Sequence, residues 1–285
     1  MPLNGGKSTP PHTVFDVCLD YTNSEWGDKL TAYKGTSLTY DAVGNPLSYY
    51  NGSAYNFTWV QGRRLETATK SGQTYTYTYN ADDIRTSKNV WGITIEYILN
   101  GSQIIGEKWS NGTTIVYIYD AEASPIGMLY RDASYAQGEF DVYWYEKNLF
   151  GDVIAVYDSD GTKLVSYTYD AWGNCSEYSA DTVPLTIARN PFRYRGYYYD
   201  VETGFYYLNS RYYDPAIGRF ISADGLLAGN AGDLEGYNLF AYCFNDPINL
   251  TDGEGNWPKW LKKVVTAVVI VVAVAAVATV VVKFC

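Results

Sequence analysis

The residue types that most often carry catalysis are scarce and poorly spaced in this sequence. Histidine, the usual general base of a catalytic triad, occurs once, as His12, in a Pro-rich stretch that favours a solvated loop. The cysteines lie far apart, so no C-x-x-C pair with zinc or redox spacing exists. They are Cys18, Cys175, Cys243 and Cys285. We therefore predict no metal, no cofactor and no His- or Cys-based active site.

A second pattern combines arginine, aspartate and aromatic rings. After Asn190 the sequence reads PFRYRGYYYD, and further on GFYYLNSRYYDP and GRFISAD. Arginine over a Tyr face gives a cation–π contact. We expect Asp200 and Asp214 to form ion pairs with arginines of the same segment, which are Arg193, Arg195, Arg211 and Arg219.

Composition narrows the partners and the fold. The formal net charge of the 285-residue chain is −10, which argues against binding a nucleic-acid backbone. The chain holds 30 Tyr against 10 Phe. Because a Tyr ring packs across strands and keeps a polar hydroxyl, this excess favours a sheet with one buried and one hydrated face.

Tyr or Trp, often followed by Asp or Asn, recurs along the first half of the chain. The anchors are Tyr40-Asp41, Trp59, Tyr79-Asn80, Tyr97 and Tyr119-Asp120, at intervals of 19, 20, 18 and 22 residues. Turn pairs such as Asn51-Gly52 arrive about every ten residues, and the segments between them alternate as in Thr74–Tyr79. The pattern predicts an all-β fold, a long antiparallel sheet of successive hairpins that must twist and curl.

The chain resembles the Rhs/YD-repeat family. The upstream part carries YD-like repeats, YDAVGN from Tyr40 and YDAWGN from Tyr169. The segment Phe192 to Asp224 is similar to the Rhs repeat-associated core, and Gly236 to Cys243 is similar to its closing portion. The resemblance implies a partial shell of β-sheet that is closed by the core. It also implies as partners the chain's own C-terminal effector or upstream shell segments, and an immunity protein. It also implies a bacterial, secreted or cell-surface protein.

Four regions follow from this reading. Residues 1–30 are expected to be an N-terminal leader, residues 31–189 the repeat sheet, residues 190–256 the core and residues 257–285 an apolar helix. Met1 to Pro10 contains no apolar h-region of a secretory signal. Because the chain starts almost directly in repeats, we expect it to be a piece of a longer protein.

The resemblance also suggests self-cleavage. Members of the family can cut themselves beside the core with aspartates in two D-P-x-G elements, and Asp224 and Asp252 fall at the matching places. A carboxylate pair that shares one proton supplies a base and an acid. Neither element here has the proline, since Gly225 follows Asp224 and Gly253 follows Asp252. The alternative is that both aspartates are turn residues that accept backbone N–H bonds.

The stretch from Val264 to Val282 is 19 residues long and carries no charge. As a helix it would span about 28 Å, close to the apolar thickness of a bilayer. Trp257, Trp260 and nearby lysines suit a membrane interface. We expect a membrane-inserting helix, with a buried aggregation-prone segment as the alternative.

A third class of function is carbohydrate binding at the surface of a Tyr-rich sheet. The sequence offers Tyr rings for stacking on sugars, but it shows no convergent set of polar residues for them. The leading expectation is therefore a structural shell segment, before self-cleavage and carbohydrate binding.

Overall fold

The computed structural model describes residues 19–22, 27–179, 183, 187, 190–225, 238–253, 255 and 259–260. Fourteen strands form one sheet, and each strand pairs with its neighbours in sequence, so the sheet is an antiparallel meander. This confirms the prediction of a long antiparallel sheet of hairpins. The strands are β4 (Thr39–Tyr40), β5 (Pro46–Tyr50), β6 (Ala54–Val60), β7 (Arg64–Lys70), β8 (Gln73–Tyr79), β9 (Arg85–Val90), β10 (Ile93–Asn100), β11 (Gln103–Trp109), β12 (Thr114–Tyr119), β13 (Pro125–Arg131), β14 (Asp141–Lys147), β15 (Val153–Tyr157), β16 (Lys163–Tyr169) and β17 (Cys175–Ser179).

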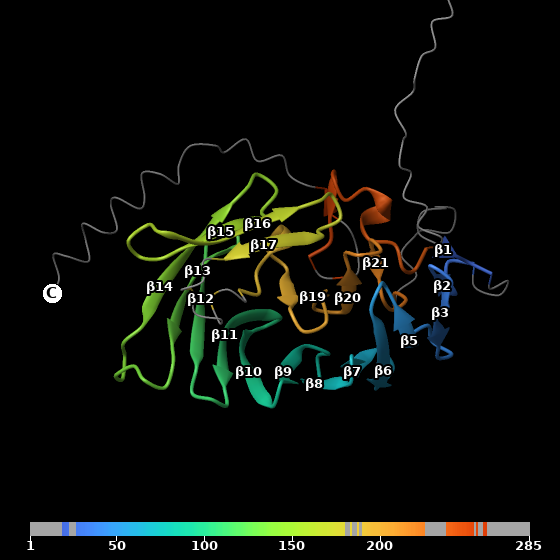
Figure 1. Ribbon diagram of the computed structural model, residues 1–285, viewed down its shortest axis with the longest axis horizontal. Helices are drawn as coiled ribbons and strands as arrows, with labels where there is room; N and C mark the ends of the chain where they lie inside the picture. Colours follow the sequence, from blue (N-terminus) through green and yellow to red (C-terminus); the bar gives the residue numbers. More distant parts are fainter. Residues whose placement is uncertain are drawn as a thin grey trace, which may run out of the picture.

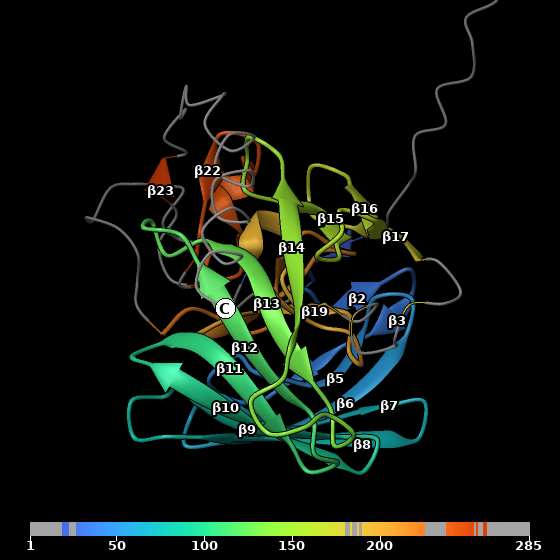
Figure 2. The same cartoon turned by 90° about the vertical axis from the view of Figure 1, so that its left-hand side faces the viewer.

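We call this sheet the wall. It curls from β5 and β6 through β10 and β14 to β17 into an open arch (Figures 1 and 2). Side chains alternate as the period-two pattern predicts. In β8, Tyr75 and Tyr77 are buried on the concave face, while Thr74 and Thr76 are exposed on the convex face. The Tyr face therefore looks inward.

The curl has a local cause that recurs with the sequence period. Register shifts occur just before Tyr40, Trp59, Tyr79, Leu99 and Tyr119. Such β-bulges bend a strand and increase its twist. Four of these five bulge residues are predicted anchors. The remaining predicted anchor, Tyr97, is wrong. Tyr97 faces inward two residues before the bulge, and Leu99 occupies the anchor position, which makes the period more regular than the tyrosines suggested.

The Asp or Asn after an anchor builds the turn. Its side-chain oxygen accepts hydrogen bonds from the backbone N–H groups two and four residues later, as Asp170 does from Trp172 and Asn174 at 2.9 and 3.0 Å. The residue three positions on has a positive φ, which glycine adopts without strain, and Gly173 holds it here at 88°. The same pattern follows Asp41, Asn80, Asp120, Asn148 and Asp158.

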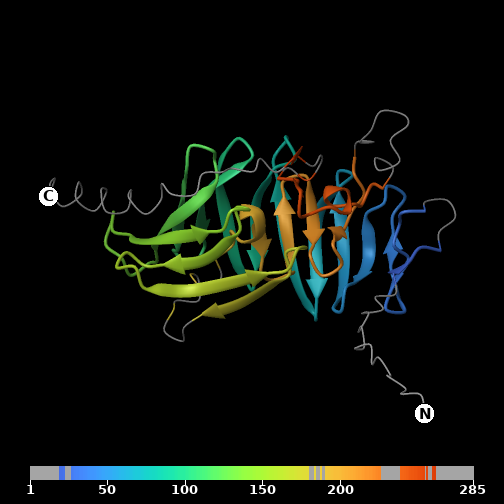
Figure 3. The ribbon, with the colours of Figure 1, turned by 90° about the horizontal axis from the view of Figure 1, so that it is seen from above.

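The space on the concave side of the wall is filled by residues 190–225 and 238–253, which we call the core segment (Figures 1 and 3). Its central sheet has the order β18-β19-β20-β21, and every residue of β19 and β20 is buried. The elements are the 3-10 turn η1 (Tyr194–Gly196), β18 (Tyr198–Asp200), β19 (Phe205–Leu208), β20 (Arg211–Asp214), β21 (Arg219–Phe220), the 3-10 turn η3 (Cys243–Asn245) and β22 (Leu250–Thr251).

Both predicted ends of the chain differ in part from the structure. A small sheet of β1 (Leu19–Asp20), β2 (Ala32–Tyr33) and β3 (Thr36–Ser37) lies beside the wall, so strand pairing begins within the predicted leader. Lys259–Trp260 forms β23, which pairs with β22, although the sequence placed these residues at the start of a helix. The predicted membrane helix, Val264 to Val282, lies outside the described residues. Within the part that the structure describes, no helix is long and apolar enough to cross a membrane.

Two glycines in equivalent turns give a matched test of wall–core packing. A Cβ on Gly173 would lie 2.7 Å from a ring atom of Tyr194 in the core segment, whereas a Cβ on Gly161 would meet nothing within 4 Å. Both have a positive φ, 88° and 83°. We expect Gly161→Ala to lower the free energy of unfolding by about 1 kcal/mol through backbone strain. Gly173→Ala should cost about 2–3 kcal/mol because overpacking is added. Urea unfolding measures both, and equal losses would contradict the contact.

Candidate functional site at the wall–core interface

The two aspartates predicted from the family resemblance meet at one guanidinium. Arg211 of β20 points its Nη2 to 3.0 Å from Asp224 Oδ2 and to 3.9 Å from Asp252 Oδ2. All three side chains are buried. The fold therefore places Asp224 and Asp252 within ion-pair distance of the same guanidinium, while self-cleavage by the two aspartates stays a prediction.

The surroundings of Arg211 are built to hold a cation. Its guanidinium lies 3.6 Å from the centre of the Phe220 ring, donates to the Leu239 carbonyl at 2.9 Å through Nη1, and donates to the Gly255 carbonyl through Nε. Burial lowers the pKa of Arg211 to about 10, against the opposing pull of Asp224 and Asp252. The guanidinium is therefore still charged at neutral pH and balances carboxylate charge at this site.

Asp252 also makes the backbone hydrogen bonds that are typical of a turn residue. Its Oδ1 accepts the Gly255 N–H at 2.9 Å, and its own N–H donates to the Tyr197 hydroxyl at 3.0 Å. Backbone hydrogen bonds to a carboxylate close a tight turn. The Arg211 cluster therefore ties the end of the core segment to β20.

A larger ionic cluster joins the core segment to the wall. Arg85 and Lys88 of β9 meet Asp200 of β18 and Glu202 of the following turn. Arg85 Nη1 lies 2.5 Å and Lys88 Nζ 2.9 Å from Asp200, and Lys88 Nζ lies 3.0 Å from Glu202. We call these four residues the ion clasp.

Aromatic rings surround the ion clasp on the side of Arg85. The Cζ atom of Arg85 lies between 4.2 and 5.8 Å from the centres of five tyrosine rings, two on the wall and three on the core segment. They are Tyr77, Tyr97, Tyr198, Tyr207 and Tyr212. Ring faces and carboxylates together replace the water that a buried guanidinium loses.

The two carboxylates of the ion clasp respond differently to the same burial. For Asp200, desolvation by itself raises the pKa, but the charges of Arg85 and Lys88 outweigh it and the pKa is lowered. For Glu202, desolvation dominates over the attraction of Lys88, Asp200 adds repulsion, and the pKa is raised. Asp200 is therefore the firmly ionised centre of the cluster.

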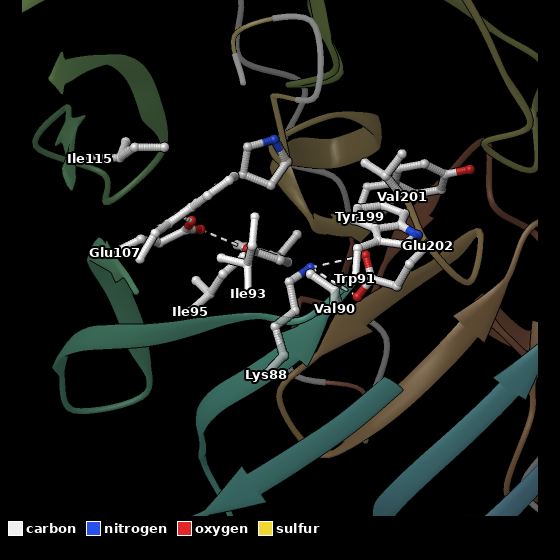
Figure 4. A pocket seen from close by; sticks show the side chains of 13 residues that line it. Lys88, Val90, Trp91, Ile93, Ile95, Glu107, Ile115, Tyr199, Val201 and Glu202 are labelled. Atoms are coloured by element: carbon white, nitrogen blue, oxygen red, sulfur yellow. Dashed lines mark hydrogen bonds and ion pairs between the residues drawn. The ribbon is translucent and has the colours of Figure 1, made fainter. Parts of the chain in front are cut away.

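A small cavity of about 50 Å³ borders the ion clasp (Figure 4). Figure 4 shows Lys88 reaching Glu202 at one end of the cavity, while Glu107 lies at the other end, beyond Ile93 and Ile95. Glu107 is also satisfied, since it accepts hydrogen bonds from Trp109 Nε1 at 2.7 Å, Tyr117 at 2.7 Å and Tyr198 at 2.6 Å. A cavity of this size holds a few water molecules, so the polar groups here serve cohesion.

The arginines and aspartates singled out in the sequence find other partners than predicted. Asp200 binds Arg85 and Lys88 of the wall, and Asp214 accepts hydrogen bonds from Tyr49 at 2.8 Å and Asn51 at 2.7 Å. The prediction of ion pairs with arginines inside the segment was wrong for both aspartates, because the core strands turn these carboxylates towards the wall.

The arginines do form the predicted cation–π contacts. Arg193 packs on Tyr167 and Tyr199, with ring centres 4.8 and 4.6 Å from its Cζ, and pairs with Glu177 of β17 at 2.8 Å. In the described part of the chain, no group of three His, Cys, Asp or Glu residues could hold a metal ion. The two clusters are thus ionic and aromatic junctions between segments.

Comparison with known proteins agrees with this architecture. The Teneurin YD-shell family matches residues 99–248. The tRNA3(Ser)-specific nuclease WapA of Bacillus spizizenii is 35% identical over 87% of this chain and 10% of its own length. Toxin subunit YenC2 of Yersinia entomophaga is 30% identical over 52% of this chain and 15% of its own length.

The fold also occurs in a solved toxin assembly. A chain of the Photorhabdus luminescens Tc holotoxin pore superposes with a TM-score of 0.57 and 21% identity, covering 81% of this chain and 11% of that chain. The chain spans about a tenth of the length of the first curated relatives that it matches. With a curled YD-repeat wall, a buried core segment and these matches, the chain belongs to the Rhs/YD-repeat family and is a shell-type structural segment of it.

Proposed function

We propose that this chain forms the last part of a shell wall and the plug that closes it, in a bacterial toxin-type protein that encloses or presents a C-terminal effector. The observation that carries the proposal is the core segment itself, which fills the concave side of the wall and is fixed there by the ion clasp. A plug must resist withdrawal, and buried charge pairs penalise any opening that breaks them.

The two edges of the wall fit a larger shell. Among the described residues, β17 pairs only with β16, and the short strand β4 pairs only with β5. An edge strand presents unpaired N–H and C=O groups that can extend a sheet. Upstream shell segments are therefore the proposed partners at these edges, and secretion or display at the bacterial cell surface is the proposed location.

The effector side of the proposal rests on the apolar stretch Val264 to Val282. We propose that it inserts into a membrane, with an immunity protein as a further partner in the producing cell. The net charge of −10 gives no support for nucleic acid as a partner of this segment. The relatives named as nucleases are much longer than this chain.

Limited trypsin digestion and vesicle binding test this function together. We expect a resistant fragment that retains both the wall and the core segment up to about Trp260, because their ion pairs and rings are buried. We expect the full chain, and not a chain truncated after Trp260, to co-sediment with phosphatidylglycerol vesicles. Rapid, uniform digestion would refute the plug, whereas equal sedimentation of both chains would refute only the membrane role.

Self-cleavage by Asp224 and Asp252 is a second candidate function. It is supported by one observation, the burial of both aspartates around Arg211. Intact mass measured between pH 4 and 8 tests it. Cleavage by the pair predicts two fragments that Asp224→Asn abolishes, and a single mass of 31.9 kDa at every pH would eliminate it. The carbohydrate alternative gains no support from the inward-facing wall tyrosines such as Tyr75 and Tyr77, since these are buried.

A further inference from the structure

A groove of about 580 Å³ lies where the wall meets the core segment, and none of its lining residues belongs to the ion clasp or to the Arg211 cluster. Its floor includes Ile154 of β15, Tyr167 of β16 and Tyr194 of η1. Its rim is formed by the loop between β14 and β15 on one side and by the stretch before β22 on the other. This groove is more than ten times larger than the cavity beside the ion clasp.

The rim of the groove is unusually apolar for a surface. Phe150 and Ile248 line the groove and are 49 and 59% exposed, and Leu149, which precedes Phe150 in the rim loop, is 78% exposed. They are three of the four most exposed large hydrophobic side chains in the described part of the chain. Single exposed apolar residues are common, but a cluster around a concavity marks an interaction surface.

The groove is held in shape by one buried arginine. Arg195 donates to the Phe150 carbonyl at 3.3 Å and to the Pro247 carbonyl at 2.7 Å, so it connects the two rims. Its guanidinium also lies 4.7 Å from the centre of the Phe150 ring, and its backbone N–H donates to Asp152 at 2.8 Å. The groove is therefore a preformed feature rather than a gap between loose loops.

The last described strand, β23 (Lys259–Trp260), runs antiparallel to β22, the strand that follows Ile248. In the antiparallel pair of β22 and β23, Leu250 lies opposite Trp260 and Thr251 opposite Lys259. A chain that leaves Trp260 in this direction runs back towards Asn249 and then Ile248. Val264 follows four residues after Trp260, a reach of up to about 14 Å.

The outgoing chain also has the right chemistry for the groove. Lys262 and Lys263 come first, and the exposed carboxylate of Asp170 lines the groove. The 19 uncharged residues from Val264 to Val282 follow, and they gain by leaving water for an apolar surface. We infer that the stretch Val264–Val282 of the same chain docks into the groove lined by Phe150 and Ile248, next to Leu149, and covers it when no membrane is present.

Site-specific photo-crosslinking tests the contact in the full chain. With p-benzoylphenylalanine at position 149, we expect crosslinks within one chain to peptides from residues 264–282, at a yield that does not change on dilution. Position 47 is the matched control, since Leu47 is 43% exposed on β5 at the other end of the wall, and it should give none. Equal yields from both positions, or crosslinks only between copies, would overturn the inference.

A protease assay gives an independent reading without a probe. In the full chain, Leu149→Glu combined with Ile248→Glu should make the Val-rich stretch at least about tenfold more sensitive to elastase, as followed by intact mass, because charge at the rim opposes apolar docking. Both positions are exposed, so the fold should survive. Leu47→Glu should leave the cleavage rate unchanged. Wild-type sensitivity of the double variant would count against docking.

Discussion

Asp200→Asn is expected to lower the free energy of unfolding by about 3–5 kcal/mol, the range for breaking a buried ion pair on one side. Asp200 is fully buried and receives Arg85 at 2.5 Å and Lys88 at 2.9 Å. Loss of its charge leaves two buried cations with only Glu202 to balance them, while the shape of the side chain is kept. Urea unfolding followed by tyrosine fluorescence would measure the loss.

An exposed pair serves as the control for this effect. Lys163 and Glu146 lie 3.6 Å apart with side chains 52 and 44% exposed. Exposed pairs contribute about 0–1 kcal/mol, so Glu146→Gln should change the free energy of unfolding by no more than that. A loss for Asp200→Asn as small as that for Glu146→Gln would show that the ion clasp does not hold the core segment in the wall.

The hairpin meander could be predicted from sequence because its signals are local. The type of turn residue and the alternation within strands act over fewer than ten residues, and the Tyr-Asp anchors repeat at intervals of only 18 to 22 residues. The one misplaced anchor has a local explanation as well. Tyr97 is an inward-facing wall residue, and the anchor position at the bulge is held by Leu99, which carries no recognisable signal.

The ion clasp could not be found in this way, for two physical reasons. Its partners are 112 to 115 residues apart in the chain, so no short pattern joins them. The bulge opposite Tyr79 also inserts an extra residue into β9, which places Arg85 and Lys88 on the same inward face. Simple alternation assigns Lys88 to the outer face, where a lysine attracts no attention.

The Asp224 and Asp252 pair shows the reverse case. Neither residue stands out by composition or spacing, and only the family resemblance drew attention to them. The structure places both at Arg211, but the spacing of the two elements said nothing about an arginine between them. Sequence similarity located the cluster, and the contacts supplied its electrostatic character.

The second large effect is a pH dependence centred on Asp214. Burial raises the pKa of this carboxyl to about 6, although hydrogen bonds from Asn51, Tyr49 and the Ala216 N–H oppose the rise. Because the folded state binds the proton more tightly than the unfolded chain, Asp214 stabilises the fold below about pH 4 and this contribution is lost as the pH rises to about 6. A rise of about two pKa units corresponds to about 3 kcal/mol.

The expected result is a difference between two stability curves. Relative to Asp214→Asn, the wild-type chain should lose about 3 kcal/mol of unfolding free energy between pH 4 and pH 7. Tyr49→Phe removes a donor to the carboxylate and should move the midpoint of this loss above about pH 6. Tyr117→Phe is the matched control, because it removes a buried hydroxyl that binds Glu107 instead. Parallel curves for the wild type and Asp214→Asn would disprove the assignment.

The position of Asp214 gives this titration a structural consequence. It lies at the end of β20 in the core segment, and its partners Tyr49 and Asn51 belong to β5 and the turn after it in the wall. Protonation therefore removes the cost of burying a charged carboxylate at this wall–core junction, while the ion clasp at β9 keeps its Asp200 ionised through the lowered pKa. Glu202 in the ion clasp also has a raised pKa, so its protonation acts in the same direction as that of Asp214. Mild acid is therefore expected to stabilise the packing of the core segment in the wall relative to neutral pH.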